Sequence, residues 1–459
     1  MDEHKNRWII LQYLVVGAFL SPLDYFIVNM ALPEIKTFFH ATENQLQMVI
    51  AIYGLTYAAL VICSGKLGDI YGRKKIFTLG LWIFLFSSIA CGLSPTINFL
   101  IFFRFLQGIG ASLLAPQVLA SIKILFNESE RSKALGFFGS VFGLAAIIGQ
   151  LLGGILLDLH LWGMTWEIIF FINVPVAAIC LYGIYANMPA EQIKKQSLDL
   201  GGIILIISAL LCFITPLIYG RAFNWSWWIF ALIFLSFILI ITFIQYEKYR
   251  EKRNKTVLLS LSLFQNKDFA YNLPIILFYN FTAGLFICYP YYLQEHLRWG
   301  VLASGLAIVP YGIGFFLGPI LFARIYKSPA FWIQLALGLL LFSFIALGVN
   351  FYLLNKPNFI SHLLFLFAGL GHGLIMPVMM KESIRSITIE QAGQASGIVS
   401  TIIQVGSVLG GAIIGTLFFS FTTSLGFSTA LAIALSAIGA VQLFGVSFYL
   451  INSKKQVKH

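Results

Sequence analysis

GKLGDIYGRKK, residues 65–75, is a short charged segment between two long apolar stretches that centre near Ile52 and Phe84. Its three glycines allow the ends of two helices to turn and to approach each other closely. Asp69 can face a helix N-terminus or pair with Arg73. The segment therefore predicts a charged latch at the cytoplasmic side, and the alternative is an ordinary solvated loop that carries positive charge on that side.

The composition of the chain indicates that its helices lie in lipid. Of the 459 residues, 59% are hydrophobic and 10% are charged, whereas a soluble globular protein carries about 25% charged residues. The chain cannot supply the polar surface that a water-soluble protein of this length needs, so the missing polar surface must face lipid. The net charge of +11 fits the enrichment of Lys and Arg in cytoplasmic loops. We therefore expect no nucleic acid as a partner.

A window of about 19 residues, moved along the chain, predicts roughly fourteen membrane spans of about 20 residues each. The seventh and eighth are separated only by residues 220–226, so a single feature is the alternative there. The predicted spans centre near Gly17, Ile52, Phe84, Gln107, Leu144, Val176, Ile207, Leu235, Phe281, Gly312, Leu340, Phe367, Val405 and Ile438.

The distribution of Lys and Arg predicts the orientation of these spans. If the N-terminus is cytoplasmic, all but five of the 29 Lys and Arg residues fall in cytoplasmic segments. The exceptions are Lys36, Arg221, Arg298 and Lys356 outside, and Arg104 within a span. This asymmetry follows the positive-inside rule. It predicts an even number of spans with both termini cytoplasmic, because the loss of one helix would invert the pattern downstream.

The most polar internal segment, residues 246–268, has eight predicted spans before it and six after it. We interpret this as two similar six-helix bundles joined by an extra helical hairpin, with residues 1–190, 191–255 and 256–459 as the three parts. The glycines at positions 149, 153 and 154 in the fifth span are repeated at positions 406, 410 and 411 in the thirteenth. Internal repeats of this kind are typical of secondary transporters.

Asp24, within SPLDYFIVNMALP (residues 21–33), is the acidic residue furthest from any predicted loop. Burial among apolar helices disfavours the charged form of a carboxylate, so this group can bind and release a proton as its surroundings alternate between wet and dry. The alternative is a carboxylate permanently paired with a basic group. Other acidic residues fall near span ends, where hydrated headgroups make them ordinary: Glu34, Asp158, Glu167 and Asp199.

Arg104 lies in the middle of the fourth span, where a charge costs about 2.5–3.5 kcal/mol on insertion scales. It must therefore face protein or water. Gln107 follows three residues later on the same helical face, which suits the wall of a central cavity. The alternative is a buried arginine that only ties helices together through backbone carbonyls.

Further polar and aromatic residues inside spans are candidates for a substrate cavity. His372 lies between glycines in the twelfth span and either titrates near neutrality or is a neutral, hydrogen-bonded histidine. Aromatic side chains such as Tyr279 can line a cavity for flat or cationic ligands. With Gln107 and Gln404, these residues form the predicted cavity wall. We expect no metal and no cofactor, because the five cysteines form no paired motif and the seven histidines are scattered.

Six segments, in order along the chain, resemble motifs of the major facilitator superfamily. GKLGDIYGRKK resembles the signature between the second and third helices, and RFLQGIGA (104–111) resembles the fourth-helix motif. Four further segments resemble motifs of the fourteen-span drug:proton antiporters of the multidrug efflux type: LDYFIVNMALP (23–33), AIIGQLLGG (146–154), FFINVP (170–175) and GQASGIVSTIIQVG (393–406). The resemblance implies an all-α polytopic membrane protein with the major facilitator fold, two six-helix bundles plus two extra helices.

The resemblance also implies roles for individual residues. Asp24 would be the proton-linked carboxylate, and Arg104 would assist proton transfer. A cytoplasmic gate that steadies the outward-open state would consist of Gly65, Asp69, Gly72 and Arg73. The antiport motif, which permits close helix packing and bending, would consist of Gly149, Gln150, Gly153 and Gly154.

The chain departs from this subgroup at three places. Gln150 stands where the antiporter motif usually has proline, so the fifth span can bend differently. Trp166 is followed by Glu167 where arginine is usual, which makes Glu167 a candidate second acidic site for cationic substrates. Ile403 stands before Gln404 where arginine is usual.

These observations predict a proton-coupled secondary transporter that exports amphipathic small molecules, of the drug or multidrug efflux type, by alternating access. The alternative is a proton symporter or facilitator that imports a nutrient or siderophore on the same fold. An ATP-driven pump is excluded because Lys66 is followed by Leu67 and not by the Ser or Thr of a phosphate-binding loop, and we expect no enzyme. We expect a monomeric multi-pass protein of the inner (plasma) membrane, with the lipid bilayer, protons and a small-molecule substrate as its partners.

Overall fold

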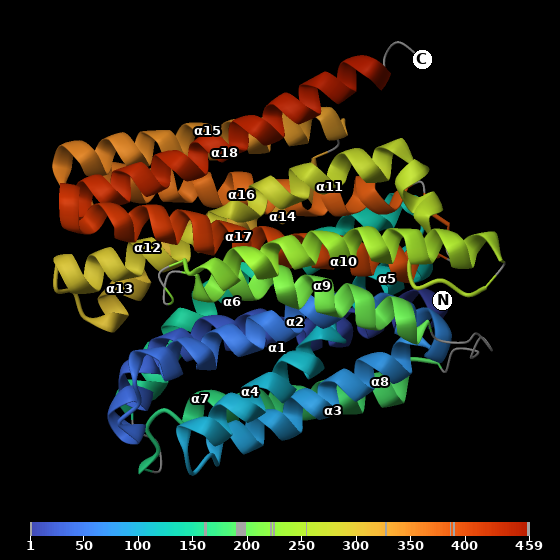
Figure 1. Cartoon of the computed structure of the whole chain (residues 1–459), viewed down its shortest axis with the longest axis horizontal. Coiled ribbons are helices and arrows are strands. Elements are labelled where there is room, and N and C mark those ends of the chain that lie inside the picture. Colours follow the sequence, from blue (N-terminus) through green and yellow to red (C-terminus); the bar gives the residue numbers. More distant parts are fainter. Residues whose placement is uncertain are drawn as a thin grey trace. The chain divides into compact units, whose positions relative to one another are not determined.

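The computed structural model describes residues 2–159, 163–189, 199–220, 223, 225–253, 255–325, 328–385, 387–388 and 391–456. Within these residues the chain forms helices and no strand, which confirms the predicted all-α fold (Figure 1). Arg221 and the predicted boundary between residues 190 and 191 lie outside the described residues.

The helices are, in chain order, α1 (Asp2–Phe39), α2 (Glu43–Tyr71), α3 (Arg73–Gly92), α4 (Ile97–Ser112), α5 (Ala115–Leu125), α6 (Glu128–Leu159), α7 (Ile168–Phe171), α8 (Asn173–Asn187), α9 (Leu200–Tyr219), α10 (Trp227–Lys252), η2 (Leu261–Gln265), α11 (Lys267–Tyr279), η3 (Asn280–Gly284), α12 (Leu285–Tyr291), η4 (Tyr292–His296), α13 (Val301–Ala307), α14 (Val309–Arg324), α15 (Pro329–Leu354), α16 (Phe359–Arg385), α17 (Ala392–Leu425) and α18 (Phe427–Gln456).

Among the described residues, 13 helical segments are long and apolar enough to cross a membrane, and they contain every predicted span centre except Gly312. That centre lies in α14, which has 16 residues and is separated from α13 at Ile308. Pro310 stands in the first turn of α14, where its missing N–H is tolerated. The seventh and eighth predicted spans are two separate helices, α9 and α10. The count of fourteen spans and the cytoplasmic position of both termini stay predictions.

Two compact units emerge from the contacts within the chain. The first unit consists of Met1–Asn127, Ile155–Asn266 and Ile387–Thr401, and the second unit consists of Glu128–Gly154, Lys267–Ser386 and Ile402–His459. Both α6 and α17 therefore contribute residues to each unit. Since these units are not continuous in sequence, the three predicted parts of the chain stay a prediction.

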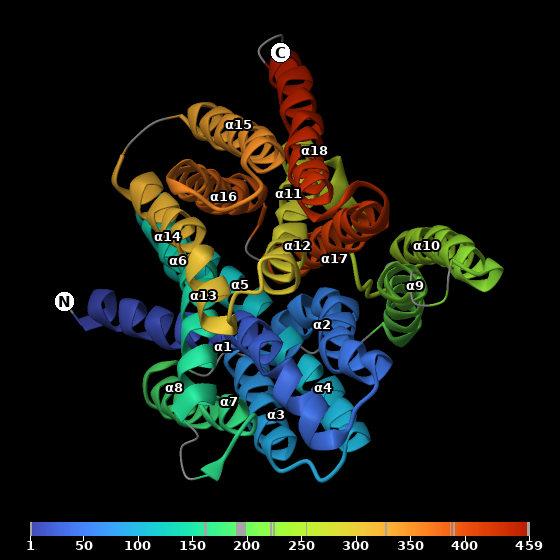
Figure 2. The same ribbon diagram turned by 90° about the vertical axis from the view of Figure 1, so that its left-hand side faces the viewer.

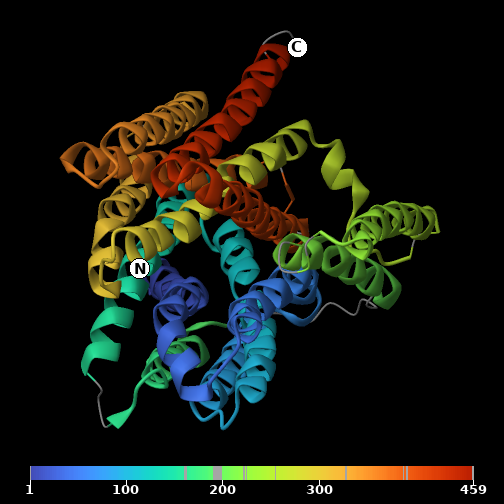
Figure 3. The same ribbon diagram turned by 60° about the vertical axis from the view of Figure 1, so that its left-hand side comes forward.

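Each unit is built from helices packed face to face. In the first unit, α2 and α3 both pack on α4, α1 packs on α8, and the hairpin of α9 and α10 packs on α2 (Figure 2). In the second unit, α16 packs between α14 and α15, and α15 also packs on α18 (Figures 2 and 3).

Local sequence explains several helix ends. Thr42 begins α2 with a capping box, in which the Gln45 backbone N–H donates to Thr42 Oγ1 over 3.3 Å and the Thr42 backbone N–H donates to Gln45 Oε1 over 2.9 Å. Gly72 separates α2 from α3 with a φ of 89°, in a region that L side chains rarely adopt. This glycine therefore permits the sharp turn within residues 65–75.

Candidate functional site

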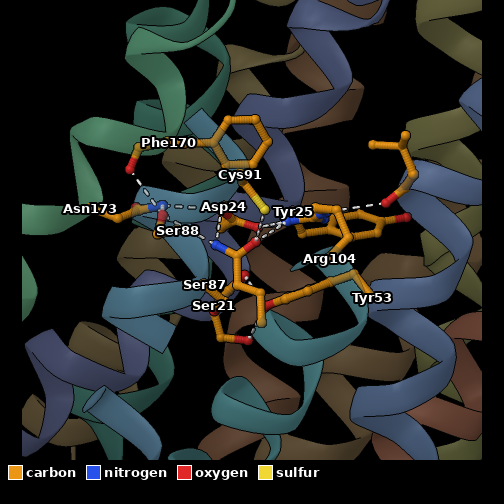
Figure 4. A network of polar contacts seen from close by, with 12 residues as sticks. Ser21, Asp24, Tyr25, Tyr53, Ser87, Ser88, Cys91, Arg104, Phe170 and Asn173 are labelled. Atoms are coloured by element: carbon orange, nitrogen blue, oxygen red, sulfur yellow. Dashed lines mark hydrogen bonds and ion pairs between the residues drawn. The ribbon is translucent and has the colours of Figure 1, made fainter. Parts of the chain in front are cut away.

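Asp24 and Arg104, both predicted from the sequence, form an ion pair that is fully buried (Figure 4). Asp24 lies in α1 and Arg104 in α4, and neither side chain is exposed. Arg104 Nη1 donates to Asp24 Oδ2. Of the two interpretations of Asp24, the paired carboxylate is therefore the one present in this structure.

Two side-chain amides complete the contacts of the Asp24 carboxylate. Gln107 Nε2 donates to Asp24 Oδ1 over 2.8 Å, and Asn173 Nδ2 donates to the same oxygen over 3.0 Å. In all of these contacts the carboxylate oxygen is the acceptor, so none of them requires a proton on Asp24. Hydrogen bonds to charged groups are worth about 1.5–3 kcal/mol each.

Helix geometry places these donors around α1. Gln107 lies three residues after Arg104, on the same face of α4, and Arg104 Nη1 also donates to Gln107 Oε1 over 2.7 Å. Asn173 is the first residue of α8, directly after the short helix α7. The junction of these two helices therefore positions an amide against Asp24.

Ser88 of α3 connects the two amides. Its Oγ donates to the Phe170 carbonyl oxygen over 2.9 Å and lies 3.3 Å from Gln107 Nε2 and 3.0 Å from Asn173 Nδ2. Because the single hydroxyl hydrogen is used at Phe170, Ser88 can only accept from the amides. This fixes the NH₂ groups toward Ser88 and Asp24 and leaves Asn173 Oδ1 buried without a hydrogen-bond partner.

Arg104 is also held by α2. Its Nε donates to the Val49 carbonyl oxygen over 3.1 Å, and its guanidinium carbon lies 4.2 Å from the centre of the Tyr53 ring, in a cation–π contact. The Tyr53 hydroxyl donates to the Ser21 carbonyl oxygen over 3.0 Å. One charge pair thus joins α1, α2 and α4.

Sequence reasoning identified three members of this cluster and missed Asn173, Ser88 and Tyr53. Asn173 had a usable signal, since it is an amide within the apolar segment FFINVP. Ser88 and Tyr53 had none, because their contacts depend on how separate helices pack.

The predicted gate residues lie together at the turn between α2 and α3. Arg73 Nη2 donates to Asp69 Oδ1 over 2.7 Å, with both side chains largely buried. A methyl group at Gly65 would lie 1.9 Å from the Gly393 carbonyl oxygen, so α2 and the beginning of α17 meet backbone to backbone. A methyl group at Gly393 would lie 2.4 Å from both Asp69 carboxylate oxygens. These contacts fit the latch and not an ordinary solvated loop.

The predicted antiport segment is part of α6, which continues through it as one helix. Gly149, Gln150, Gly153 and Gly154 are all buried. A methyl group at Gly154 would lie 3.1 Å from Leu302 Cδ1, so α6 packs closely against α13. The role of this segment in exchange stays a prediction.

The four residues of the predicted cavity wall are distributed over both units. Gln107 belongs to the Asp24 cluster in the first unit, and Gln404 is half-buried in the part of α17 that belongs to the second unit. His372 and Tyr279 lie side by side in the second unit, with ring centres 5.1 Å apart. His372 Nδ1 lies 3.1 Å from Thr282 Oγ1, which fits a hydrogen-bonded histidine.

Two further candidate sites, the acidic residue Glu167 and a metal site, were also compared with the structure. Glu167, the candidate second acidic site, accepts from the Thr165 backbone N–H over 2.8 Å and from the Thr165 hydroxyl over 3.0 Å. This is a local turn before α7. Within the described part of the chain, no three His, Cys, Asp or Glu side chains are grouped closely enough to hold a metal ion.

Comparison with known proteins places these features in a family context. Residues 14–200 and 200–411 match the family described as Major Facilitator Superfamily. The chain is 30% identical over 430 residues to the probable actinorhodin transporter of Streptomyces coelicolor, covering 92% of this chain and 74% of the relative. It is 30% identical over 424 residues to the tetracenomycin C resistance and export protein of Streptomyces glaucescens, covering 90% and 76%. It is 28% identical over 419 residues to the multidrug transporter protein MdtP of Bacillus subtilis, covering 90% and 75%.

Two solved structures have a similar fold. The human organic anion transporter MFSD10 (TETRAN) aligns with a TM-score of 0.70 at 14% identity, covering 97% of this chain and 99% of that chain. The proton:xylose symporter XylE aligns with a TM-score of 0.68 at 14% identity, covering 97% and 95%. At this identity the likeness concerns the fold alone.

Proposed function

Because this chain belongs to the major facilitator superfamily, we propose that it is a secondary transporter that exports amphipathic small molecules in exchange for protons. The relatives support this proposal, since they include a resistance and export protein and a multidrug transporter. The chain is a multi-pass membrane transporter by family and by the 13 apolar helical segments found among its described residues. Its location in the inner (plasma) membrane and its action as a monomer are parts of the proposal.

The buried pair of Asp24 and Arg104 is the observation that carries the proposal. Ionisable side chains inside a membrane are costly and typically mark ion or proton pathways. Removing one partner of a buried ion pair costs about 3–5 kcal/mol, because the other charge is left uncompensated. Protonation of Asp24 removes its charge without removing its side chain, so it acts directly on this interaction.

A proton on Asp24 would rearrange the contacts of α1. The protonated carboxyl group has an O–H donor, while Arg104, Gln107 and Asn173 all present N–H donors to the carboxylate. The proton removes the negative charge that strengthens these hydrogen bonds, and its O–H needs an acceptor that none of the three N–H groups provides. The proton therefore favours a different arrangement of α1 against α4 and α8. A ligand that prefers one of two conformations shifts the population toward it.

Exchange follows when substrate and proton favour different states of the transporter. Coupling between two binding sites is reciprocal, so a substrate that favours the ionised Asp24 promotes proton release, and a proton promotes substrate release. A tenfold difference in proton concentration is worth about 1.4 kcal/mol. For each exchanged proton, this free energy can maintain about a tenfold gradient of an uncharged substrate.

The latch between α2 and α3 would serve as the gate of this cycle. Asp69, Arg73 and the glycine contact of Gly65 with Gly393 hold α2 against the beginning of α17. Movement of α17 away from α2 would break these contacts together. Such a gate steadies one state, the outward-open state by the family resemblance, and opens for the other.

Gln107, His372, Gln404 and Tyr279 are the proposed substrate contacts, which combine hydrogen-bonding groups with an aromatic face. The buried segment with Gly149, Gln150, Gly153 and Gly154 in α6 would adjust the packing of this helix during exchange.

Proton-coupled import is a second candidate function. The buried Gln150, in a segment where α6 continues as one helix, favours it, because the antiporter motif has proline at this place. Movement of substrate with the proton and not against it distinguishes the two functions.

Everted membrane vesicles provide the test. Energised vesicles with the wild type should take up ethidium and consume the pH gradient at the same time, and a protonophore should abolish both. Asp24→Asn should lose both, while Asp158→Asn, which changes an exposed carboxylate at the end of α6, should behave as the wild type. A wild type that neither takes up ethidium nor changes the pH gradient would contradict broad drug export.

A further inference from the structure

A second pair of acidic side chains is buried in the hairpin of α9 and α10, the green hairpin of Figure 3. Asp199 precedes α9, and Glu247 lies near the end of α10. The position of Asp199 near a span end predicts a hydrated carboxylate, but it is only 3% exposed, and Glu247 is 0% exposed. The expectation for Asp199 is wrong because α10 covers it.

Because Gly202 has no side chain, both carboxyl groups can lie against its backbone. A methyl group at Gly202 would lie 2.5 Å from Glu247 Oε1 and 2.9 Å from Asp199 Oδ2. Both of these oxygens are buried without a hydrogen-bond partner. Two ionised carboxylates are both acceptors only, so a hydrogen bond between these oxygens requires a proton on one of them.

Only one positive charge faces this pair among the described residues. Arg250 Nε lies 3.0 Å from Asp199 Oδ2, and the Tyr246 hydroxyl donates to Asp199 Oδ1 over 3.2 Å. The segment that follows α10 approaches Glu247 with the Leu259 backbone N–H. If both carboxyl groups were ionised, the cluster would bury a net negative charge, which is strongly unfavourable.

The segment after α10 is attached to this cluster, and we name residues 256–262 the strap. The Leu259 backbone N–H donates to Glu247 Oε2 over 3.4 Å. Arg250 donates to the Thr256 carbonyl oxygen, over 2.9 Å from Nε and 2.7 Å from Nη2. One side of the strap is therefore fixed by the same side chains that surround the acidic pair.

The other side of the strap contacts the beginning of α17. The Ser260 backbone N–H donates to Gln394 Oε1 over 2.9 Å, and Gln391 Nε2 donates to Ser262 Oγ over 3.2 Å. Gln394 follows Gly393, the residue that meets Gly65 in the latch. The strap thus connects the α9–α10 hairpin with the helix end that the proposed gate holds.

We propose that Asp199 and Glu247 bind one proton between them, and that this proton fastens the strap to the α9–α10 hairpin. The proton exchanges with water on the side of the membrane where α10 ends, which the charge pattern predicts to be the cytoplasm. The consequence for the gate rests on the proposed transport function, but the proton site and the strap do not.

The charges of the two carboxyl groups determine how release of the strap depends on pH. At lower pH the pair holds its proton and Glu247 stays buried against the strap. As pH rises, the proton leaves to water, and Glu247 becomes a buried charge next to ionised Asp199. Glu247 then moves toward water and gives up Leu259, which frees the strap. Since one proton is released for each opening, the open fraction should rise roughly tenfold per pH unit above the release point.

Infrared difference spectroscopy detects the proton directly. In the purified full-length protein in lipid, a pH increase should remove a carbonyl-stretch band of a protonated carboxyl group. This band should be absent in Glu247→Gln and in Asp199→Asn, which retains a helix-capping side chain. It should remain in Glu251→Gln, a matched change of an exposed acid one turn later. A band that persists in Glu247→Gln and Asp199→Asn, or no band in the wild type, would overturn the proposal.

Limited trypsin digestion after Lys255, at the beginning of the strap, measures its release. Wild-type cleavage, corrected with an unstructured peptide of the same sequence, should accelerate with pH. Glu247→Gln should stay slow at every pH, because the amide can donate to Asp199 without acquiring a charge. Glu251→Gln should follow the wild type, because the amide oxygen can still accept from the Ser260 hydroxyl, which donates to Glu251 Oε1 over 3.4 Å. If Glu247→Gln does not fold, the wild-type profile alone decides, since a cleavage rate independent of pH would contradict the proposal. Neither readout requires transport, so a failure of drug export would leave both results unaffected.

Discussion

Asn173→Ala is the substitution that most selectively probes the Asp24 cluster. It removes one of the two amide donors to Asp24 Oδ1 and a contact with Ser88 Oγ, both at 3.0 Å. It leaves the ion pair with Arg104 and the hydrogen bond from Gln107 in place. The variant therefore weakens the stabilisation of the ionised carboxylate without removing the charged partners.

The structure gives the size of the expected effect. A hydrogen bond to a charged group contributes about 1.5–3 kcal/mol, and each 1.4 kcal/mol corresponds to about a tenfold change in an equilibrium. Loss of the Asn173 bond destabilises the arrangement in which α4 and α8 hold the Asp24 carboxylate of α1. We predict that exchange at fixed pH falls by about ten- to a hundredfold.

Ethidium–proton exchange in everted vesicles, measured at fixed pH, is the assay. Asn187→Ala is the matched control, because Asn187 lies in the same helix and donates to the Gly183 carbonyl oxygen, over 2.8 Å. The control should keep the wild-type exchange rate. An exchange rate in Asn173→Ala equal to that of the wild type would refute the reasoning.

Three further substitutions have defined outcomes. Arg104→Ala should lower the thermal stability and abolish exchange, because it leaves Asp24 buried without its ion pair at a cost of about 3–5 kcal/mol. A variant as stable as the wild type would show that the pair is not needed for folding. Gly65→Val should abolish transport without loss of expression, since even a methyl group would lie 1.9 Å from the Gly393 carbonyl oxygen. Crosslinking of cysteines introduced near this contact should then report the separation of α2 from α17. Ser88→Ala should reduce exchange at fixed pH several-fold by freeing both amides, whereas Ser87→Ala should not, because Ser87 donates to the Ile83 carbonyl oxygen in its own helix; equal rates in the two variants would contradict the role of Ser88.

The helices of the fold were predictable because hydropathy is a property of each segment by itself. The break at Ile308 was not, since Pro310 changes the backbone hydrogen bonds without changing the apolar character of the stretch. The separation of α9 from α10 was predicted, because hydropathy gave two span centres there, at Ile207 and Leu235.

The Asp24 cluster could be predicted from the sequence only where a single residue is unusual for its surroundings. A charge in an apolar span identifies Asp24 and Arg104 from the sequence, because either charge must find a partner or water. It does not identify which partner, since the pairing of α1 with α4 and α8 is a matter of helix packing. Asn173 and Ser88 therefore entered the site only with the structure.

The same limit explains the acidic pair of the hairpin. Asp199 and Glu247 both lie near the ends of apolar helices, where charged residues are common. Their burial depends on the contact of α9 with α10 and on the absence of a side chain at Gly202. The sequence contains the glycine, but it does not contain the contact that makes the glycine matter.

The most direct test of the central claim uses proteoliposomes that contain only the purified protein and an imposed pH gradient. The account predicts that the wild type accumulates ethidium against its concentration gradient while protons move in the opposite direction. It predicts that Asp24→Asn loses this accumulation but still exchanges ethidium with ethidium across the membrane. If Asp24→Asn accumulated ethidium at the wild-type level under the same pH gradient, Asp24 would not couple proton movement to transport.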